Sequence, residues 1–401
     1  MKNLIGGKFV DASNGEKADV INPATNELID TVPLATEEDV DLCVKEAAKA
    51  QKGWAKMPLH ERGDILYKFA DLVEANHEEL AQLLSKETGK PIREARAEIS
   101  NTKHFIHGYV EKAKHDYGNV IPAGSEVGQE KTMQITVQQP LGVVACIIPF
   151  NFPCDLFGQK VPSALIMGNS VIVKPSTDNP LTLHRYCELL KDAGVPDGVI
   201  NCISGRGSVT GNALAKHPQV ALISVTGSTE VGAEVMANAA ANITHVMLEL
   251  GGNDAFIVMN DADMELTMKE LVWGRLYNTG QVCCASKRFL VQKGIKDEFI
   301  KKAVETLQSL KVAMPQQEDA DIGCLINEKA AINAEEQVRK TLDQGATLVY
   351  GGRRNGAFFE PTIIDNVTKD MDVMKDMEIF APVIPVCTFD TLDEALEIAN
   401  Q

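Results

Sequence analysis

The chain has 401 residues, more than one hydrophobic core usually holds, so two or three domains are expected. Its 39 basic and 56 acidic residues give a net charge of −17, and no basic block offsets it. Nucleic acid and anionic membranes are therefore excluded as expected partners. The N-terminus lacks the long apolar run of a signal peptide and no transmembrane stretch follows, so a cytosolic protein is expected.

The first third of the chain shows helical patterns. Thr36 with Asp39 three residues later resembles a capping box, and it predicts a helix that runs to about residue 54. Apolar residues at helical spacing predict a helix over residues 60–85, and another is expected over about 93–115. Residues 118–139 follow, and the alternation of polar and apolar types over residues 132–137 predicts that this segment is an extended arm or hairpin outside the compact core.

From residue 141 short apolar strands alternate with helices. Strands are predicted at 142–148, 170–173, 199–203, 220–225 and 244–248, with helices at about 155–168, 181–193, 207–216 and 229–240. This alternation predicts a parallel α/β sheet with both faces covered. A second α/β unit is expected from about residue 252, with strands at 255–259, 288–292 and 346–350.

The segment GQVCCASKR, residues 280–288, holds the strongest candidate nucleophile. A helix is expected over 263–277, and Asn278-Thr279-Gly280 supplies its stop, with Gly280 suited to a left-handed position. An isolated cysteine is more often an inert core residue, but Cys283 is predicted on a loop, where reactive groups are more common. An ordinary thiol has a pKa of about 8.5, so a working cysteine needs help from its surroundings.

A candidate base lies upstream in LELGGN, residues 248–253. Glu249 closes an apolar strand and is followed, after Leu250, by two glycines, an unusual place for a merely solvated carboxylate. The nine cysteines are scattered without a C-x-x-C pair or clustered histidines, so neither a zinc site nor a disulfide framework is indicated. A disulfide between Cys283 and Cys284 would be oxidative damage.

The nucleotide-binding signals are partial. Gly205-Arg206-Gly207 has the first two glycines of a Rossmann fingerprint but not the third. The strand at 220–225 runs into Gly227-Ser228-Thr229 and a helix, whose N-terminus suits a phosphate; an ordinary helix cap is the plain alternative. Lys174 follows another strand, at the sheet edge where α/β proteins bind ligands.

Six segments, in the same order, resemble the aldehyde dehydrogenase superfamily: PFNFP (149–153), VKPS (173–176), TGSTEVG (226–232), LELGGN, GQVCCASKR and EIFAPV (378–383). The resemblance implies an α/β fold with a Rossmann-type parallel-sheet cofactor domain (1–117 and 141–250) and a second α/β catalytic domain (251–401). It implies an oligomerisation arm at 118–140 and a homodimer or homotetramer. Family members usually continue for some tens of residues, so the C-terminal part of the catalytic domain is expected to be missing.

The same resemblance assigns the chemistry. Cys283, the second residue after Gly-Gln, would attack the aldehyde carbon. The Asn151 side-chain amide and the Cys283 backbone N–H would hold the resulting oxyanion. Glu249 would activate the water that hydrolyses the thioester. No metal is implied.

For the cofactor, the resemblance places Gly227 and Ser228 at the pyrophosphate. Lys174 would bind the adenosine ribose, and Glu378 and Phe380 would contact the nicotinamide riboside.

Thr177 stands where NAD-specific members commonly carry a glutamate. With Lys174 and Ser176 beside it, a 2′-phosphate would meet hydrogen-bond donors rather than like charge. NADP is therefore predicted to be accepted and preferred over NAD.

The substrate prediction rests on the helix after PFNFP, which lines the family's aldehyde tunnel. Phe152, Leu156 and Gln159, together with Cys284, are the expected tunnel residues. Semialdehyde-specific members often have an arginine where Gln159 stands, so a small aliphatic or hydroxy-aldehyde of the lactaldehyde type is favoured. Succinate semialdehyde remains the alternative, with Lys160 as a substitute anchor.

Two alternative hypotheses about function also follow from the sequence. A catalytically silent member could serve as a binding or scaffold protein, although all the reactive positions are filled. A reductive enzyme acting on acyl phosphates or thioesters would share the nucleophile but would not need Glu249.

Overall fold

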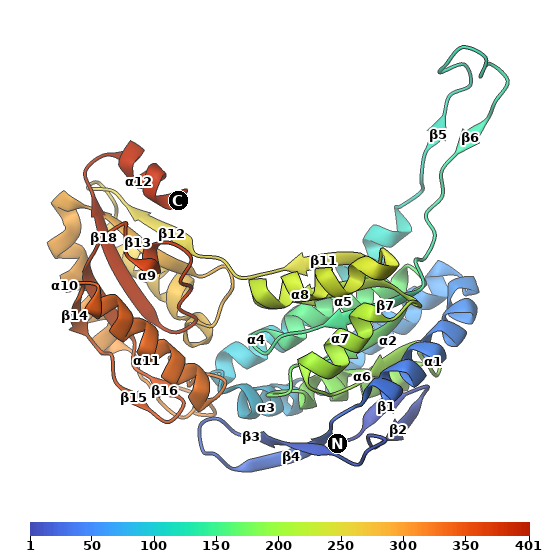
Figure 1. The fold of residues 1–401 in the computed structure, drawn as a ribbon, viewed down its shortest axis with the longest axis horizontal. Helices are drawn as coiled ribbons and strands as arrows, with labels where there is room; N and C mark the ends of the chain where they lie inside the picture. The colour runs from blue at the N-terminus through green and yellow to red at the C-terminus, as the bar shows by residue number, and fades with distance from the viewer.

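The computed structural model describes residues 1–401 and contains two principal β-sheets flanked by helices, with a long hairpin extending away from them (Figure 1). The larger sheet has the strand order β11-β10-β7-β8-β9-β1-β2. Its strands are β1 Asn3–Ile5, β2 Lys8–Val10, β7 Val143–Ile147, β8 Ser170–Lys174, β9 Ile200–Cys202, β10 Val220–Thr226 and β11 His245–Glu249. The run from β11 to β9 is parallel and confirms the predicted sheet, while β1 and β2 add an unpredicted antiparallel edge.

Apolar residues bury both faces of this sheet. Val144 and Val171 belong to a core cluster of 35 buried residues, whereas Val143 and Ile172 belong to a separate cluster of 17. Successive side chains of a strand point to opposite faces, so neighbours in sequence enter different clusters. This two-sided burial explains why the central strands are continuous apolar runs.

Helices α1 to α8 cover the two faces of the larger sheet (Figure 1). Thr36 and Asp39 form the predicted capping box at the start of α1. The predicted single helix over 60–85 is wrong: the chain breaks at Asn76, whose side-chain amide donates to the Leu72 carbonyl at 2.7 Å. The helices are α1 Glu37–Lys56, α2 Leu59–Ala75, α3 His77–Thr88, α4 Ile92–Lys114, α5 Pro153–Ile166, α6 Leu181–Ala193, α7 Asn212–Lys216 and α8 Thr229–Ala239.

The smaller sheet has the order β12-β13-β18-β17-β14, and only β14 runs antiparallel to its neighbour. Three of its strands were predicted, but β17 and β18 were not. The strands are β12 Asp254–Val258, β13 Ser286–Gln292, β14 Thr347–Tyr350, β17 Thr362–Val367 and β18 Val383–Phe389. The helices around it are α9 Met264–Leu271, α10 Lys296–Ser309, α11 Glu328–Asp343 and α12 Leu392–Ala399.

Three small hairpins complete the fold. One of them, β5 Val120–Ile121 with β6 Gln134–Ile135, is the extended arm that the sequence predicts, and it projects from the body of the molecule (Figure 1). The others pair β3 Lys17–Ile21 with β4 Leu28–Pro33 and β15 Arg354–Asn355 with β16 Phe358–Phe359. None of the helices has both the length and the apolar character needed to cross a membrane.

Candidate functional site

The loop that carries Cys283 begins with an irregular turn. Helix α9 ends at Leu271, and a single π-helical turn, Val272–Leu276, replaces the last part of the helix predicted over 263–277. Asn278, Thr279 and Gly280 follow with φ values of 50°, 55° and 77°. Gly280 therefore has the predicted left-handed conformation, but two non-glycine residues share it, which is costly for a β-branched threonine.

Neighbouring groups hold this unusual backbone in place. The Asn278 N–H donates to Glu94 Oε2 at 2.8 Å, and its side-chain amide donates to the Asn151 carbonyl at 2.9 Å. A Cβ on Gly280 would lie 2.5 Å from the Ala381 carbonyl, so glycine is required there on steric grounds as well.

Arg275 ties the cysteine loop to the EIFAPV segment. Its buried guanidinium donates to the carbonyls of Val383 at 2.6 Å and Ile379 at 2.9 Å, and also to that of Ala381. Burial lowers the pKa of Arg275 to about 9. These contacts fix the predicted nicotinamide-binding segment relative to the predicted nucleophile.

Asn151 lies beside the same loop. Its side-chain amide, the predicted oxyanion donor, is buried and donates to the Gln281 carbonyl at 3.1 Å. Lys90 Nζ donates to the Asn151 backbone carbonyl at 2.9 Å and also pairs with Glu98, and both of these side chains are fully buried. Glu98 in turn accepts the Cys154 N–H at 2.8 Å, so one ion pair braces both sides of the PFNFP turn.

The sulfur atoms of the chain fall into two groups. Seven cysteines are buried, while Cys283 is half-buried and Cys284 is exposed. Burial raises the pKa of the Cys283 thiol, and the neighbouring Cys284 thiol raises it further. The backbone of Cys283 lies against the LELGGN segment, since a Cβ on Gly252 would be 3.6 Å from the Cys283 carbonyl oxygen.

Glu249 ends β11 at the edge of the larger sheet and is exposed. Its backbone carbonyl accepts the Gly227 N–H at 3.0 Å, which joins it to the predicted pyrophosphate turn. Its side chain lines a cavity of about 500 Å³ together with Gln159, Lys160 and Ser224, and Cys283 is not among the lining residues. Lys160 is buried there and its Nζ donates to Ser224 Oγ at 2.8 Å.

Of the predicted tunnel residues, Phe152, Leu156 and Gln159 follow one face of α5, whereas Cys284 is exposed on the loop before β13. Phe152 stacks on Tyr277 with ring centres 5.9 Å apart and planes 5° apart, which brings the start of this face to the cysteine loop. Leu156 is half-buried, and Gln159 is exposed toward the cavity that contains Glu249. The structure thus connects Phe152 to one predicted catalytic segment and Gln159 to the other.

Two groups of predicted cofactor residues lie at the carboxyl ends of β8 and β10, which are parallel strands on either side of β7. Lys174 ends β8 and is buried, which lowers its pKa to about 8, and its Nζ donates to the Pro175 carbonyl at 2.9 Å. Ser176 and Thr177 are half-buried in the loop that follows. A carboxylate does lie nearby, because Asp178 accepts from Ser176 Oγ at 3.4 Å.

The turn after β10 fits a pyrophosphate group. Ser228 caps α8, where its Oγ accepts the Val231 N–H at 3.3 Å, and the other N–H groups of this first turn are available to an anion. Thr226 Oγ1 is buried without a hydrogen-bond partner at the end of the strand. Gly227 adds no side chain between them.

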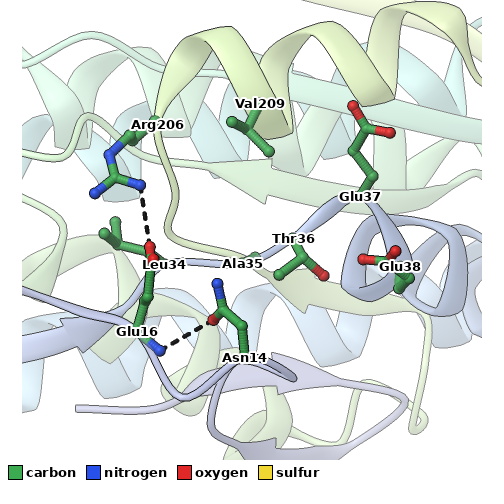
Figure 2. A pocket seen from close by; sticks show the side chains of 9 residues that line it. All are labelled: Asn14, Glu16, Leu34, Ala35, Thr36, Glu37, Glu38, Arg206 and Val209. Carbon is green, nitrogen blue, oxygen red and sulfur yellow. Dashed lines mark hydrogen bonds and ion pairs between the residues drawn. The ribbon is translucent and has the colours of Figure 1, made fainter.

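The incomplete glycine fingerprint is a poorer phosphate site. Arg206 points into a pocket of about 360 Å³ next to the start of α1, where it pairs with Glu16 at 3.1 Å (Figure 2). Glu37 and Glu38 also line this pocket, and three carboxylates repel a phosphate. No predicted site residue lies there.

Glu378 and Phe380 sit across the cysteine loop. Phe380 packs edge-on against Phe150, with ring centres 6.0 Å apart, so it touches the PFNFP turn. Glu378 Oε1 lies 2.8 Å from Lys287 Nζ, and Lys287 also donates to the Cys283 carbonyl at 2.5 Å. The structure therefore brings Glu378, Phe380, Asn151 and Cys283 into one connected network.

Sequence reasoning missed the buried cations of this network, which are Lys90, Arg275 and Lys287. The alternation of buried and exposed residues along a strand could not have predicted that Lys287 is buried, because the adjacent Arg288 is buried as well. The only available signal was the presence of charged residues inside otherwise apolar segments, which demands a buried partner.

Comparison with known proteins decides the family. The model of the aldehyde dehydrogenase family matches residues 9–401. The chain belongs to this family. D-glyceraldehyde dehydrogenase (NADP(+)) of Picrophilus torridus is 39% identical over 408 residues, covering 100% of this chain and 81% of that protein. Lactaldehyde dehydrogenase of Escherichia coli is 36% identical over 400 residues, covering 99% and 82%. The crystal structure of succinate-semialdehyde dehydrogenase from Burkholderia pseudomallei is 35% identical with a TM-score of 0.96, covering 100% and 83%.

This aldehyde dehydrogenase is thus an NAD(P)-dependent oxidoreductase with the predicted α/β fold. The relatives act on several different aldehydes at similar identity, so family membership alone leaves the substrate open.

Proposed function

We propose that this aldehyde dehydrogenase oxidises a small hydroxy-aldehyde to its acid with Cys283 as nucleophile. The observation that carries the proposal is the network that joins the Cys283 loop to Asn151 through the Gln281 carbonyl and to Glu378 through Lys287. The reaction consumes one aldehyde, one oxidised cofactor and one water, and it yields the carboxylate, the reduced cofactor and two protons.

Each of three side chains has its own role in this reaction. The Cys283 thiol loses its proton as its sulfur bonds to the aldehyde carbon, and the Asn151 amide, with the Cys283 backbone N–H, stabilises the alkoxide that develops on oxygen. A nicotinamide, when bound, supplies the acceptor for the two electrons and the hydrogen that the carbon loses. Glu249 then removes a proton from the water that breaks the carbon–sulfur bond, which releases the acid and the thiol.

The charge around the tunnel favours a neutral substrate. Asp155 follows Phe152 by one helical turn, and its Oδ1 is buried without a hydrogen-bond partner. Burial and the nearby carboxylates of Glu94, Glu98 and Asp155 raise the pKa of Tyr277. Burial raises the pKa of Asp155 to about 7, so a substrate hydroxyl could hydrogen-bond with this carboxyl, and an anionic aldehyde would be repelled by its ionised form.

Succinate semialdehyde remains the second candidate because of one observation. Lys160 lies in the cavity beside Gln159, as a buried cation whose pKa is lowered mainly by burial. It could hold a distal carboxylate in place of the arginine that this chain lacks.

For the cofactor, we infer a preference for NADP. Lys174, Ser176 and Thr177 offer an ammonium and two hydroxyls at the end of β8, a set that suits a 2′-phosphate. Asp178 opposes this, but it is exposed and its Oδ1 accepts from Asn327 at 2.9 Å.

We also infer that the arm joins copies of this chain. Val120, Val127 and Ile135 are 75%, 101% and 62% exposed, and apolar residues at this density on a hairpin suit burial against a partner. Light scattering after gel filtration should show a dimer or tetramer, and a monomer at micromolar concentration would overturn this inference.

A kinetic panel tests the proposed function. Glycolaldehyde, lactaldehyde, glyceraldehyde and succinate semialdehyde are compared with NADP and NAD by the appearance of reduced cofactor and of the acid. We expect kcat/KM to be at least about tenfold higher for a hydroxy-aldehyde than for the semialdehyde, which corresponds to about 1.4 kcal/mol. A preference for the semialdehyde would establish the second candidate, and a strong preference for NAD would refute the cofactor inference.

A further inference from the structure

Lys287 links the nucleophile to the predicted nicotinamide-binding carboxylate. Its side chain is 1% exposed, and its Nζ lies 2.8 Å from Glu378 Oε1 while it donates to the Cys283 carbonyl at 2.5 Å. The ammonium also lies 5.9 Å from the centre of the Phe380 ring. A single side chain on β13 thus contacts three residues of the site.

Glu378 has little freedom on its other side. A Cβ on Gly251 would lie 2.2 Å from Glu378 Oε2, so the carboxylate fills the space that this glycine leaves open. The Glu378 side chain is 28% exposed, and its backbone carbonyl accepts from the Gln337 side chain at 2.9 Å. Lys287 and the LELGGN backbone therefore hold the carboxylate between them.

We propose that Lys287 is a positioning residue that sets the Glu378 carboxylate for the nicotinamide riboside and keeps the Cys283 loop at a fixed distance from it. This inference rests on the proposed function. A buried ammonium needs a charged partner and further acceptors, and Lys287 finds both only in Glu378 and Cys283. Without the charge of Lys287, the Glu378 side chain would be free to turn toward solvent, and the cofactor would have to order that side chain on binding.

Cofactor affinity without turnover is the first readout. The dissociation constant of NADPH, from fluorescence titration, should rise about tenfold in Lys287→Met, equivalent to about 1.4 kcal/mol. Lys293→Met is the matched control, because Lys293 is an exposed lysine that lies just beyond the same strand and pairs with Asp390. The affinity of this control variant for NADPH should match that of the wild type. A folded Lys287→Met protein with wild-type affinity would overturn the proposal.

A double-mutant cycle separates positioning from simple structural support. If Lys287 acts through Glu378, the variant that combines Lys287→Met with Glu378→Gln should bind NADPH no more than about twofold more weakly than the weaker single variant. If the increases in the NADPH dissociation constant of the two single variants multiply in the double variant, the two residues act independently, which would contradict the proposal.

A second variant covers loss of folding. Lys287→Gln keeps a donor for the Cys283 carbonyl but removes the charge, so it should fold and show the same loss of affinity; unchanged affinity overturns the proposal. A wild-type protein that binds no dinucleotide would instead show that the proposed function has failed.

Discussion

The two segments that carry the candidate nucleophile and the candidate base differ sharply in how they are held. From Arg275 to Gln281 every residue except Tyr277 is buried, and charged side chains anchor the backbone carbonyls. In β11 no residue is buried, and the strand lies at the edge of its sheet. As walls of the candidate site, the two segments therefore differ: the wall formed by the residues before Cys283 is rigid, and the wall formed by the strand that ends at Glu249 is open to solvent.

Removing the sulfur should have the largest effect. Cys283→Ser should lower dehydrogenase turnover by about a thousandfold or more, because a hydroxyl beside no strong base is a poor nucleophile. Cys284→Ser is the control and should keep most of the activity, since its thiol is exposed outside the network. Steady-state formation of reduced cofactor measures both, and the opposite ranking would move the nucleophile by one residue.

Loosening the rigid wall should affect stability next most strongly. Arg275→Met removes the buried guanidinium that donates to three carbonyls and should lower the free energy of unfolding by about 3 kcal/mol. On the open wall, Met247→Ser should change the free energy of unfolding by less than about 0.5 kcal/mol, because Met247 is 58% exposed. Urea unfolding of both variants tests the contrast, and equal losses would show that the two walls are held alike.

Removing the base should separate the two chemical stages. Glu249→Gln should still release a burst of reduced cofactor but lower the steady-state rate about a hundredfold, because hydrolysis of the thioester then lacks its base. Stopped-flow measurement of the burst checks this. An unchanged steady-state rate would exclude Glu249 from the mechanism.

The smallest effect concerns pH. Burial raises the pKa of the Cys283 thiol, so less thiolate is present at neutral pH, and labelling by iodoacetamide should accelerate up to a midpoint above that of an ordinary thiol. In Cys284→Ser the midpoint should fall, because the neighbouring thiol no longer opposes ionisation. Labelling rates from pH 6 to 11 give both midpoints, and an identical midpoint would contradict the coupling.

Local patterns predicted the parts of the fold that local chemistry controls. Helix α6 spans the residues predicted for it, and the capping box of α1 is present, because both depend on residues a few positions apart. The break at Asn76 was missed because no glycine or proline marks it. Strands β17 and β18 were missed because their place in the sheet depends on distant partners: β18 pairs with β13, and β17 pairs with β18.

The site shows the same division. Motifs located Cys283, Glu249 and Asn151 as candidates, and their roles stay predictions. The buried contacts of Lys90, Arg275 and Lys287 were out of reach, because each joins segments up to about a hundred residues apart. Lys90 and Arg275 do so through backbone carbonyls, which carry no sequence signature, and Lys287 does so through the Glu378 carboxylate.

Three successive residues with positive φ before Cys283 have a thermal consequence. Thr279 at φ 55° is held there only by its packed surroundings, and such a conformation stores torsional energy of roughly 1–3 kcal/mol. On warming, this short stretch should relax before either sheet melts. Enzymatic inactivation would then occur at a lower temperature than the loss of the circular dichroism signal, and prior saturation with dinucleotide should reduce the difference between these two temperatures.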